Sequence, residues 1–293
     1  MRCDAEEIRV VHGRTRVVGI IGHPVDHSLS PVMQNAAFAA CQLDYVYVPF
    51  AVTPDKLEQA VCGLKALGMC GFNVTIPHKT AIIPFLDRLD ESAKSAGAVN
   101  TVHLQENSLI GYNTDGDGLL DSLALDLGYT PGAEQIMVIG AGGAARGAIA
   151  ALCRSGAQKI LICNRSLDNA RAVVRDLSAR FPDVCMDVVD QKLVRDEQVS
   201  STRLLLNTTS LGMNGERIGD MDLSRLPTHA NVYDMVYSRT VTPLIADAVA
   251  LGLPAVNGLG MLVAQGERAF TIWTGQKPPE GVMRWALDRL QCP

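Results

Sequence analysis

Two polar groups in the first half of the chain carry side chains that can move a proton. Lys79 ends the run Asn73–Lys79 (NVTIPHK), where a lysine follows an expected strand through a proline turn. Asp115 ends the run Asn113–Asp115 (NTD), at the start of an expected helix. An ammonium group can protonate a developing alkoxide, and the neutral amine can accept that proton in the reverse direction. These residue types can therefore take part in acid–base chemistry.

Each of these residues also has an ordinary interpretation, because such residues are common in loops. Lys79 taken alone is a surface lysine, Asp115 taken alone is a helix N-cap, and Asn100 taken alone is a turn residue. Asp115 is suited to orienting the lysine and the reacting hydroxyl group. The sequence does not decide which of the two side chains transfers the proton.

The glycine-rich turn Gly140–Ala145 (GAGGAA) supplies a second element of such chemistry. It follows the apolar run Ile136–Ile139 and precedes a helix expected over Ala144–Ser155. In a strand–turn–helix unit, the pattern G-x-G-x-x-G/A lets the backbone approach a pyrophosphate, and the N–H groups of the helix N-terminus face the phosphates. An ordinary tight turn is the alternative, but the next strand, Lys159–Cys163, also stands where the pattern requires it. The turn predicts a dinucleotide site.

The residues after the second strand of this unit predict which dinucleotide binds. NAD-selective sites usually carry Asp or Glu near this point, whereas an arginine accommodates the 2′-phosphate of NADP. The strand here ends at Asn164-Arg165-Ser166, so the sequence favours NADP over NAD. Ser166 is also expected to cap the following helix, Asp168–Phe181, and the two roles are compatible.

A hydroxyl-rich loop follows the first expected strand of the chain. The loop His23–Ser30 separates the strand Val17–Gly22 from a helix expected over Pro31–Cys41, with Ser30 as the N-cap. Ser28 and Ser30 at a helix N-terminus suit an anion such as a carboxylate, and helix capping alone is the other interpretation.

Strands alternate with helices along the chain, so these groups fall at the ends of strands in an α/β fold. The other expected strands are Tyr45–Phe50, Gly71–Thr75, Ala98–Val102, Leu109–Tyr112, Val184–Val188, Leu204–Asn207, Val232–Met235 and Pro254–Val256. The other expected helices are Pro54–Leu67, one from about Asp115 to Leu127, Thr242–Leu251, Met261–Thr274 and Gly281–Leu290. The pattern predicts an α/β domain followed by a Rossmann-type doubly wound domain. The final helices either cap the second domain or return to the first.

The composition narrows the function classes. The chain has 293 residues, of which 47% are hydrophobic and 19% charged, as expected of a globular enzyme. A net charge of −5 with scattered Lys and Arg argues against nucleic-acid or membrane partners. The first residues lack a signal-peptide core, and no apolar run approaches the ~18 residues of a membrane span. The eight cysteines form no C-x-x-C pair, so we expect reduced, mostly buried thiols, no metal site and a cytoplasmic location.

The chain resembles the shikimate/quinate dehydrogenase family in a series of motifs that run in the family's order over nearly its whole length. The motifs are Ser28–Pro31, Asn73–Lys79, Gly97–Thr101, Gly111–Asp115, Gly140–Ala145, Asn164–Ser166, Asn207–Met213, Tyr233–Tyr237 and Asn257–Gly266. Met1–Arg14 lies outside the resemblance.

The resemblance implies an activity and a domain arrangement. The activity is the reversible NADP-linked reduction of 3-dehydroshikimate to shikimate, a step of chorismate and aromatic amino-acid biosynthesis. The arrangement is a substrate domain over residues 1–115, to which residues 258–293 return, and an NADP-binding domain over residues 116–257. The expected partner is a small-molecule substrate, and the protein is either a monomer or a homodimer.

The resemblance also implies a role for individual residues, with Lys79 and Asp115 as the catalytic pair. The implied substrate-binding residues are Ser28, Ser30, Asn73, Thr75, Lys79, Asn100, Asp115, Tyr237 and Gln265. The two serines would hold the substrate carboxylate with help from Tyr237. The implied cofactor-binding residues are Gly140, Ala141, Gly142, Gly143, Ala144, Asn164, Arg165, Ser166, Thr208, Met235, Gly258 and Met261. The last three would lie near the nicotinamide, and Asn164–Ser166 would contact the 2′-phosphate.

One departure from the family pattern concerns the choice of cofactor. Family members often have a second arginine a few residues after the first, but this chain reads Leu167-Asp168-Asn169 there, and its next cation is Arg171. Discrimination against NAD is therefore expected to be weaker.

The alternative functions are those of a family member that prefers quinate or NAD, a non-catalytic NADP-sensing protein, and another two-domain NADP enzyme such as a folate dehydrogenase. The paired serines argue against the last.

Overall fold

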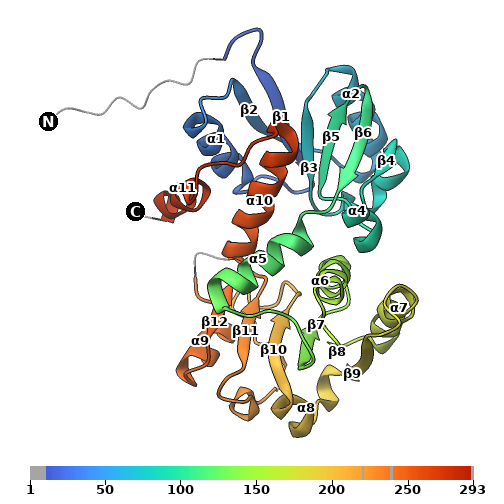
Figure 1. Ribbon diagram of the computed structural model, residues 1–293, viewed down its shortest axis with the longest axis vertical. Coiled ribbons are helices and arrows are strands. Elements are labelled where there is room, and N and C mark those ends of the chain that lie inside the picture. Colours follow the sequence, from blue (N-terminus) through green and yellow to red (C-terminus); the bar gives the residue numbers. More distant parts are fainter. Residues whose placement is uncertain (1–10, 220, 238–239, 292–293) are drawn as a thin grey trace, which may run out of the picture. The chain divides into compact units, whose positions relative to one another are not determined.

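A computed structural model describes residues 11–219, 221–237 and 240–291 and divides the chain into two compact units. Unit 1 comprises Met1–Arg88, Asn100–Gly111 and Ala269–Pro293. Unit 2 comprises Leu89–Val99 and Tyr112–Arg268. Each unit is built around its own six-stranded sheet (Figure 1).

The sheet of unit 1 has the strand order β2-β1-β3-β5-β6-β4. Its strands are β1 (Arg16–Gly22), β2 (Tyr45–Ala51), β3 (Gly71–Val74), β4 (Arg88–Leu89), β5 (Thr101–Gln105) and β6 (Ser108–Tyr112). β1 pairs in parallel with β2 and β3, and β5 runs antiparallel to β3. The helices are α1 (Ser30–Ala40), α2 (Leu57–Ala66), α3 (His78–Ala81) and α11 (Val282–Gln291). The loops after β1 and β3 therefore leave the sheet at the same edge.

The C-terminal residues complete the core of unit 1. Phe38 of α1 stacks on Tyr45 and on Phe270, with ring centroids 5.0 Å apart in both pairs. Phe270 and Trp273 lie in the second half of α10 (Leu259–Thr274), and the Trp273 indole donates a hydrogen bond to the Val102 carbonyl at 3.0 Å. Aromatic burial contributes to this attachment, because each such ring removes a large apolar area from water.

The sheet of unit 2 is entirely parallel, with the order β12-β11-β10-β7-β8-β9. Its strands are β7 (Gln135–Ile139), β8 (Lys159–Asn164), β9 (Cys185–Asp190), β10 (Thr202–Asn207), β11 (Asn231–Asp234) and β12 (Ala255–Asn257). Its helices are α4 (Glu91–Ala96), α5 (Asp115–Leu127), α6 (Gly143–Arg154), α7 (Leu167–Ser178), α8 (Asp196–Ser200), α9 (Pro243–Ala250) and the first part of α10. The strand order reverses between β7 and β10, and ligands of such sheets bind at that point.

The apolar run of β7 is explained by burial on both faces. Ile136 and Val138 belong to one hydrophobic cluster, and Met137 and Ile139 belong to another. Successive side chains of a strand point to opposite faces, so the two clusters lie on the two sides of the sheet. A strand covered on both sides reads as a continuous apolar run, as the sequence indicated.

The expected fold class is confirmed, with a parallel doubly wound second sheet and helices at the C-terminus. The expected strands and helices are present, with ends shifted by a few residues, but three expectations were wrong. Ser30 is the first residue of α1, and the N-cap is Leu29. Ala98–Asn100 precede β5 and are not part of it. Among the six described cysteines only Cys70, Cys153 and Cys163 are buried.

Short elements account for most of what the sequence did not indicate. α4 and α8 were not expected, because six and five residues hold too few turns for a helical period to be visible. Within the described ranges, no helix combines the length and the apolar character that crossing a membrane requires.

Candidate active site

A buried hydrogen-bond network in unit 1 joins Ser30 to Asn73 through Tyr47. The Tyr47 hydroxyl donates to Asn73 Oδ1 at 2.7 Å and is hydrogen-bonded to the side chain of Ser30. Burial raises the pKa of Tyr47, so its hydroxyl stays protonated and can donate. Tyr47 was not predicted as a site residue, because an aromatic residue in a strand is usually a core residue.

The same network continues from Asn73 into the segment before β5. Asn73 Nδ2 donates to the Asn100 carbonyl and to Thr101 Oγ1, at 3.0 Å in each case. Thr101 Oγ1 in turn donates to Asn100 Oδ1 at 3.0 Å. Asn73, Asn100 and Thr101 are all buried. The structure thus brings three of the predicted substrate residues, Ser30, Asn73 and Asn100, into one network.

Lys79 lies at the second position of the short helix α3, on a turn that is held at its base. The backbone N–H of His78 donates to the Thr75 carbonyl at 2.9 Å, and the buried His78 ring contacts the Val52 carbonyl through Nε2 at 2.7 Å. Thr75 and Lys79 are partly exposed. The turn therefore fixes the backbone of Lys79, whose side chain is partly exposed.

Asp115 begins α5 in unit 2, and its backbone is held by Asn113. The N–H of Asp115 donates to Asn113 Oδ1 at 3.1 Å, and Asn113 Nδ2 donates to the Ala98 carbonyl at 3.0 Å. Asn113 is buried, whereas Asp115 is partly exposed. The helix start is therefore anchored by an amide side chain.

The structure brings Gln265 to the first turns of the same helix. Thr114 Oγ1 donates to the Gln265 carbonyl at 3.1 Å. A Cβ added at Gly118 would lie 2.8 Å from the Gln265 backbone nitrogen, so the two helices touch closely at this glycine. Asp115 and Gln265, predicted on separate motifs, are therefore carried by one packed helix pair in unit 2.

The glycine turn after β7 has the geometry that a pyrophosphate site needs. Gly140 adopts φ of +112°, and its N–H donates to the Cys163 carbonyl at 2.9 Å. An added Cβ would lie 2.6 Å from Thr208 Oγ1, so both backbone and space require glycine. Gly142 is the N-cap of α6 and provides no side-chain cap. The first N–H groups of α6 are therefore available to an anion, and the residues present fit a dinucleotide.

The residues after β8 present a cation beside this turn. Arg165 and Ser166 are exposed, and Arg165 takes part in no ion pair among the described residues. Ser166 caps α7, as expected, by accepting from the Asn169 N–H at 3.4 Å. Arg171, the next cation, is exposed and already pairs with Asp168 at 3.5 Å. Arg165 is thus an exposed cation directly after β8, at the position for which the sequence predicts contact with the 2′-phosphate.

Three more predicted cofactor residues gather where β10, β11 and β12 end. The Thr208 N–H and Oγ1 both donate to the Ile139 carbonyl, at 2.9 and 2.7 Å. The Met235 N–H donates to the Asn207 carbonyl at 2.9 Å, and Gly258 is joined to the Val236 carbonyl at 3.3 Å. Neighbouring strands therefore hold Thr208, Met235 and Gly258 at the same edge of the sheet as the glycine turn. Met261 follows in the first turn of α10, and Tyr237, 40% exposed, lies just beyond β11.

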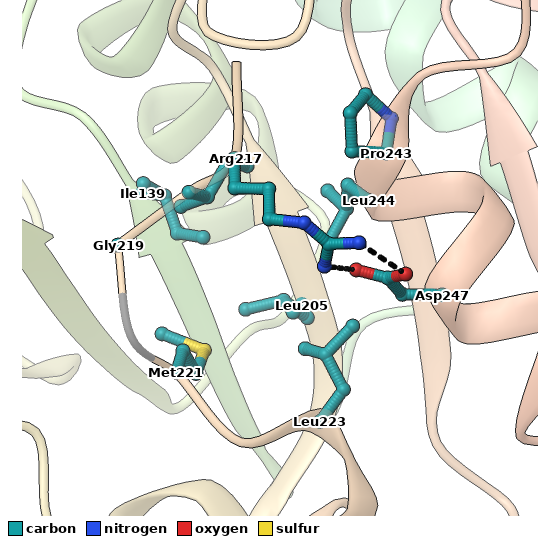
Figure 2. Close-up of a pocket in the computed structure, with 10 residues that line it drawn as sticks. Ile139, Leu205, Arg217, Gly219, Met221, Leu223, Pro243, Leu244 and Asp247 are labelled. Atoms are coloured by element: carbon teal, nitrogen blue, oxygen red, sulfur yellow. Dashed lines mark hydrogen bonds and ion pairs between the residues drawn. The ribbon is translucent and has the colours of Figure 1, made fainter. Parts of the chain in front are cut away.

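Figure 2 shows a hollow in unit 2 that differs from this strand-end site. An ion pair between Arg217 and Asp247 stands beside it, and its volume is about 40 Å³. On the same measure a cavity of about 10–15 Å³ holds one water molecule, so the hollow has room for a few waters. The rest of its lining is mostly apolar and consists of Ile139, Leu205, Ile218, Gly219, Met221, Leu223, Pro243 and Leu244.

The predicted site residues fall into two sets, one in each unit. Unit 1 carries Ser28, Ser30, Asn73, Thr75, Lys79 and Asn100. Unit 2 carries Asp115, Tyr237, Gln265 and all the predicted cofactor residues. Ser28 Oγ accepts a hydrogen bond from the Ser30 N–H at 3.3 Å, which places the two serines side by side at the start of α1.

Comparison with known proteins identifies what the chain is similar to. Residues 20–102 match the family model described as shikimate dehydrogenase substrate binding domain. Residues 123–202 match shikimate/quinate 5-dehydrogenase, and residues 258–287 match shikimate 5′-dehydrogenase C-terminal domain. A relative from Geobacter sp. strain M21, named shikimate dehydrogenase (NADP(+)), is 52% identical over 285 residues, which is 97% of this chain and 98% of the relative.

Solved structures give the same picture. A crystal structure of a shikimate dehydrogenase in complex with NADP+ is 37% identical, with a TM-score of 0.89 over 97% of this chain and 98% of that one. A shikimate 5-dehydrogenase from Thermus thermophilus, in complex with NADP(H) and shikimate, is 31% identical. Its TM-score is 0.82, over 94% of this chain and 99% of that one.

Proposed function

Because this chain belongs to the shikimate dehydrogenase family, we propose that it catalyses the reversible NADP-linked reduction of 3-dehydroshikimate to shikimate. The observation that carries the proposal is the turn Gly140–Ala145, which sits at the switch point of a doubly wound sheet and starts α6 without a side-chain cap. A family likeness over nearly the whole of both chains supports the choice of substrate.

Three sets of residues in unit 2 would hold three parts of the cofactor. Gly142, Gly143 and Ala144 present backbone N–H groups to the pyrophosphate, because they form the start of α6. Asn164, Arg165 and Ser166 contact the 2′-phosphate, with Arg165 supplying a planar cation. Thr208, Met235, Gly258 and Met261 hold the nicotinamide half at the ends of β10 to β12 and the start of α10. The cofactor, when bound, supplies the hydride that carbonyl reduction requires.

Lys79 and Asp115 would manage the proton. As the carbonyl oxygen of the substrate becomes an alkoxide, the Lys79 ammonium stabilises its charge and transfers a proton to it. In the oxidation of shikimate, the neutral amine takes that proton back. Asp115 orients the reacting hydroxyl group, and Gln265 on the neighbouring helix assists it.

The other residues of unit 1 would bind the rest of the substrate. Ser28 and Ser30 hold the carboxylate, with Tyr237 as a further hydrogen-bond donor. Asn100 and Thr75 hold ring hydroxyl groups. Asn73 keeps Asn100 in place, since both ends of its side chain are used in the network that also contains Tyr47.

The cellular setting is part of the same proposal. We place the protein in the cytoplasm, as a monomer or homodimer that acts on a small-molecule substrate in aromatic amino-acid biosynthesis. The free thiols of the described cysteines support a reducing compartment.

The test is a rate measurement on the purified protein with shikimate and NADP+, followed by the absorbance of NADPH. We expect NADPH formation, with slower rates when NAD+ replaces NADP+ or when quinate replaces shikimate. A higher kcat/KM with quinate or NAD+ would favour the family member of other preference. Tight NADP+ binding without any turnover would favour a sensing protein and would end the proposal.

A further inference from the structure

Asp234 carries a fully buried carboxyl group that takes no part in the proposed mechanism. It is the last residue of β11 and is 0% exposed. None of the ion pairs among the described residues includes it. Burial of a carboxylate without a cationic partner is costly, so its surroundings must compensate through hydrogen bonds.

Three hydrogen bonds provide that compensation, and they come from three separate segments. Asn207 Nδ2, at the end of β10, donates to Asp234 Oδ1 at 2.8 Å. The N–H of Val236, in the segment after β11, donates to the same oxygen at 3.1 Å. Thr242 Oγ1, at the N-cap of α9, donates to Oδ2 at 2.6 Å. Hydrogen bonds to a buried charged group are stronger than neutral ones, so the carboxylate ties these segments together.

The tied segments are those that carry the nicotinamide side of the proposed cofactor site. Asn207 Oδ1 accepts from the N–H and the hydroxyl of Thr209, at 3.0 and 2.7 Å, which shapes the turn containing Thr208. The Met235 N–H donates to the Asn207 carbonyl at 2.9 Å, immediately beside the carboxylate. The 2′-phosphate residues follow β8, which is separated from β11 by β10 and β7 in the sheet. The network therefore acts on one half of the site.

We infer that Asp234 is a positioning residue, which holds Thr208 and Met235 in place for the nicotinamide half of the cofactor. It touches neither substrate nor cofactor and acts through Asn207 and the backbone of Val236. The inference rests on the proposed function, because that proposal places NADP at this sheet edge.

The experiment compares two ligands that differ in the nicotinamide half. Binding of NADP+ and of adenosine 2′,5′-bisphosphate is measured by calorimetry for the wild type, Asp234→Ala and Asp234→Asn. We expect Asp234→Ala to weaken NADP+ binding by about ten-fold or more, and binding of the bisphosphate by less than about two-fold. Asp234→Asn restores most of the NADP+ affinity, because the amide oxygen still accepts from Asn207 and Val236.

Two further variants keep the test decisive. Val199→Ala removes a buried side chain of α8, which leads into the amino end of β10, at the edge of the sheet opposite to the site. This variant should destabilise the fold and leave the affinities for NADP+ and for the bisphosphate unchanged. Asn207→Ala reproduces the selective loss of NADP+ affinity if Asp234→Ala does not fold. Equal weakening of both ligands, no weakening of either, or failure of Asp234→Asn to restore binding would each overturn the inference. A wild type that binds NADP+ but does not oxidise shikimate refutes the proposed function alone.

Discussion

Tyr47→Phe is the substitution that most directly tests the network of unit 1. It removes one oxygen atom and leaves the ring, which is 2% exposed and fully packed, unchanged in size. The hydroxyl group it removes donates to Asn73 Oδ1 at 2.7 Å and is hydrogen-bonded to the side chain of Ser30. Both partners are themselves buried, so neither gains water in exchange.

The size of the effect follows from the two bonds. A neutral hydrogen bond contributes about 0.5–1.5 kcal/mol net, and a buried polar group left without its partner costs about 1–3 kcal/mol. We therefore expect Tyr47→Phe to lower the free energy of unfolding of unit 1 by about 2–3 kcal/mol. Because Asn73 also holds Asn100, we expect kcat/KM for shikimate to fall by about ten-fold or more, with KM for NADP+ little changed.

Tyr129→Phe is the matched control, because the chemical change is the same. The Tyr129 hydroxyl is also buried, but no hydrogen-bond partner for it exists among the described residues. Its removal should leave the free energy of unfolding unchanged or slightly raised, and the kinetics unaltered. Urea unfolding followed by circular dichroism, together with steady-state kinetics, measures both variants. Equal stability losses in the two variants, or an unchanged kcat/KM for shikimate in Tyr47→Phe, would refute the reasoning.

Three further substitutions test other parts of the site. Lys79→Ala should lower kcat by about 10²–10⁴, the usual size of a general acid–base contribution, with little change in NADPH affinity; a near-normal kcat contradicts the assignment. Gly118→Ala should push Gln265 away, lower the free energy of unfolding by about 1–3 kcal/mol and reduce kcat/KM for shikimate. Gly63→Ala is the control, because a Cβ there meets nothing within 4 Å, and it should leave the free energy of unfolding in urea unchanged or raise it. Burial raises the pKa of Asp234, so its carboxyl group favours folding at low pH, and that contribution is lost as the pH rises through the folded-state pKa. The melting temperature of Asp234→Asn relative to wild type should therefore rise between pH 4 and pH 7, and a constant difference would contradict this sign.

Local patterns account for the parts of the protein that its sequence predicted well. The turn after β7 needs a glycine at Gly140 because of its positive φ, and this requirement is visible in the sequence as a fixed spacing of small residues. β7 is buried on both faces, so it reads as an unbroken apolar run. Arg165 directly follows β8, and its contact with the 2′-phosphate stays a prediction.

Other features could not be predicted, because they depend on residues that are distant in the sequence. Tyr47 and Asn73 are 26 positions apart, and Asn207 and Asp234 are 27 apart. Nothing local distinguishes Tyr47 from a core tyrosine. Ser30 was expected to be an N-cap from its type and neighbours, but α1 begins one residue earlier and its hydroxyl is bonded to Tyr47 instead.

The sequence by itself determined the fold class, the dinucleotide turn and the residue types available for proton transfer. These follow from short-range periodicity and from backbone demands that only certain residues meet. The tertiary structure decided how those residues are supported: which buried amides hold Asn100, which helix carries Gln265 beside Asp115, and which carboxylate joins the ends of β10 and β11. The physical reason is that hydrogen bonds between buried polar groups form only when folding brings distant segments together and excludes water from them.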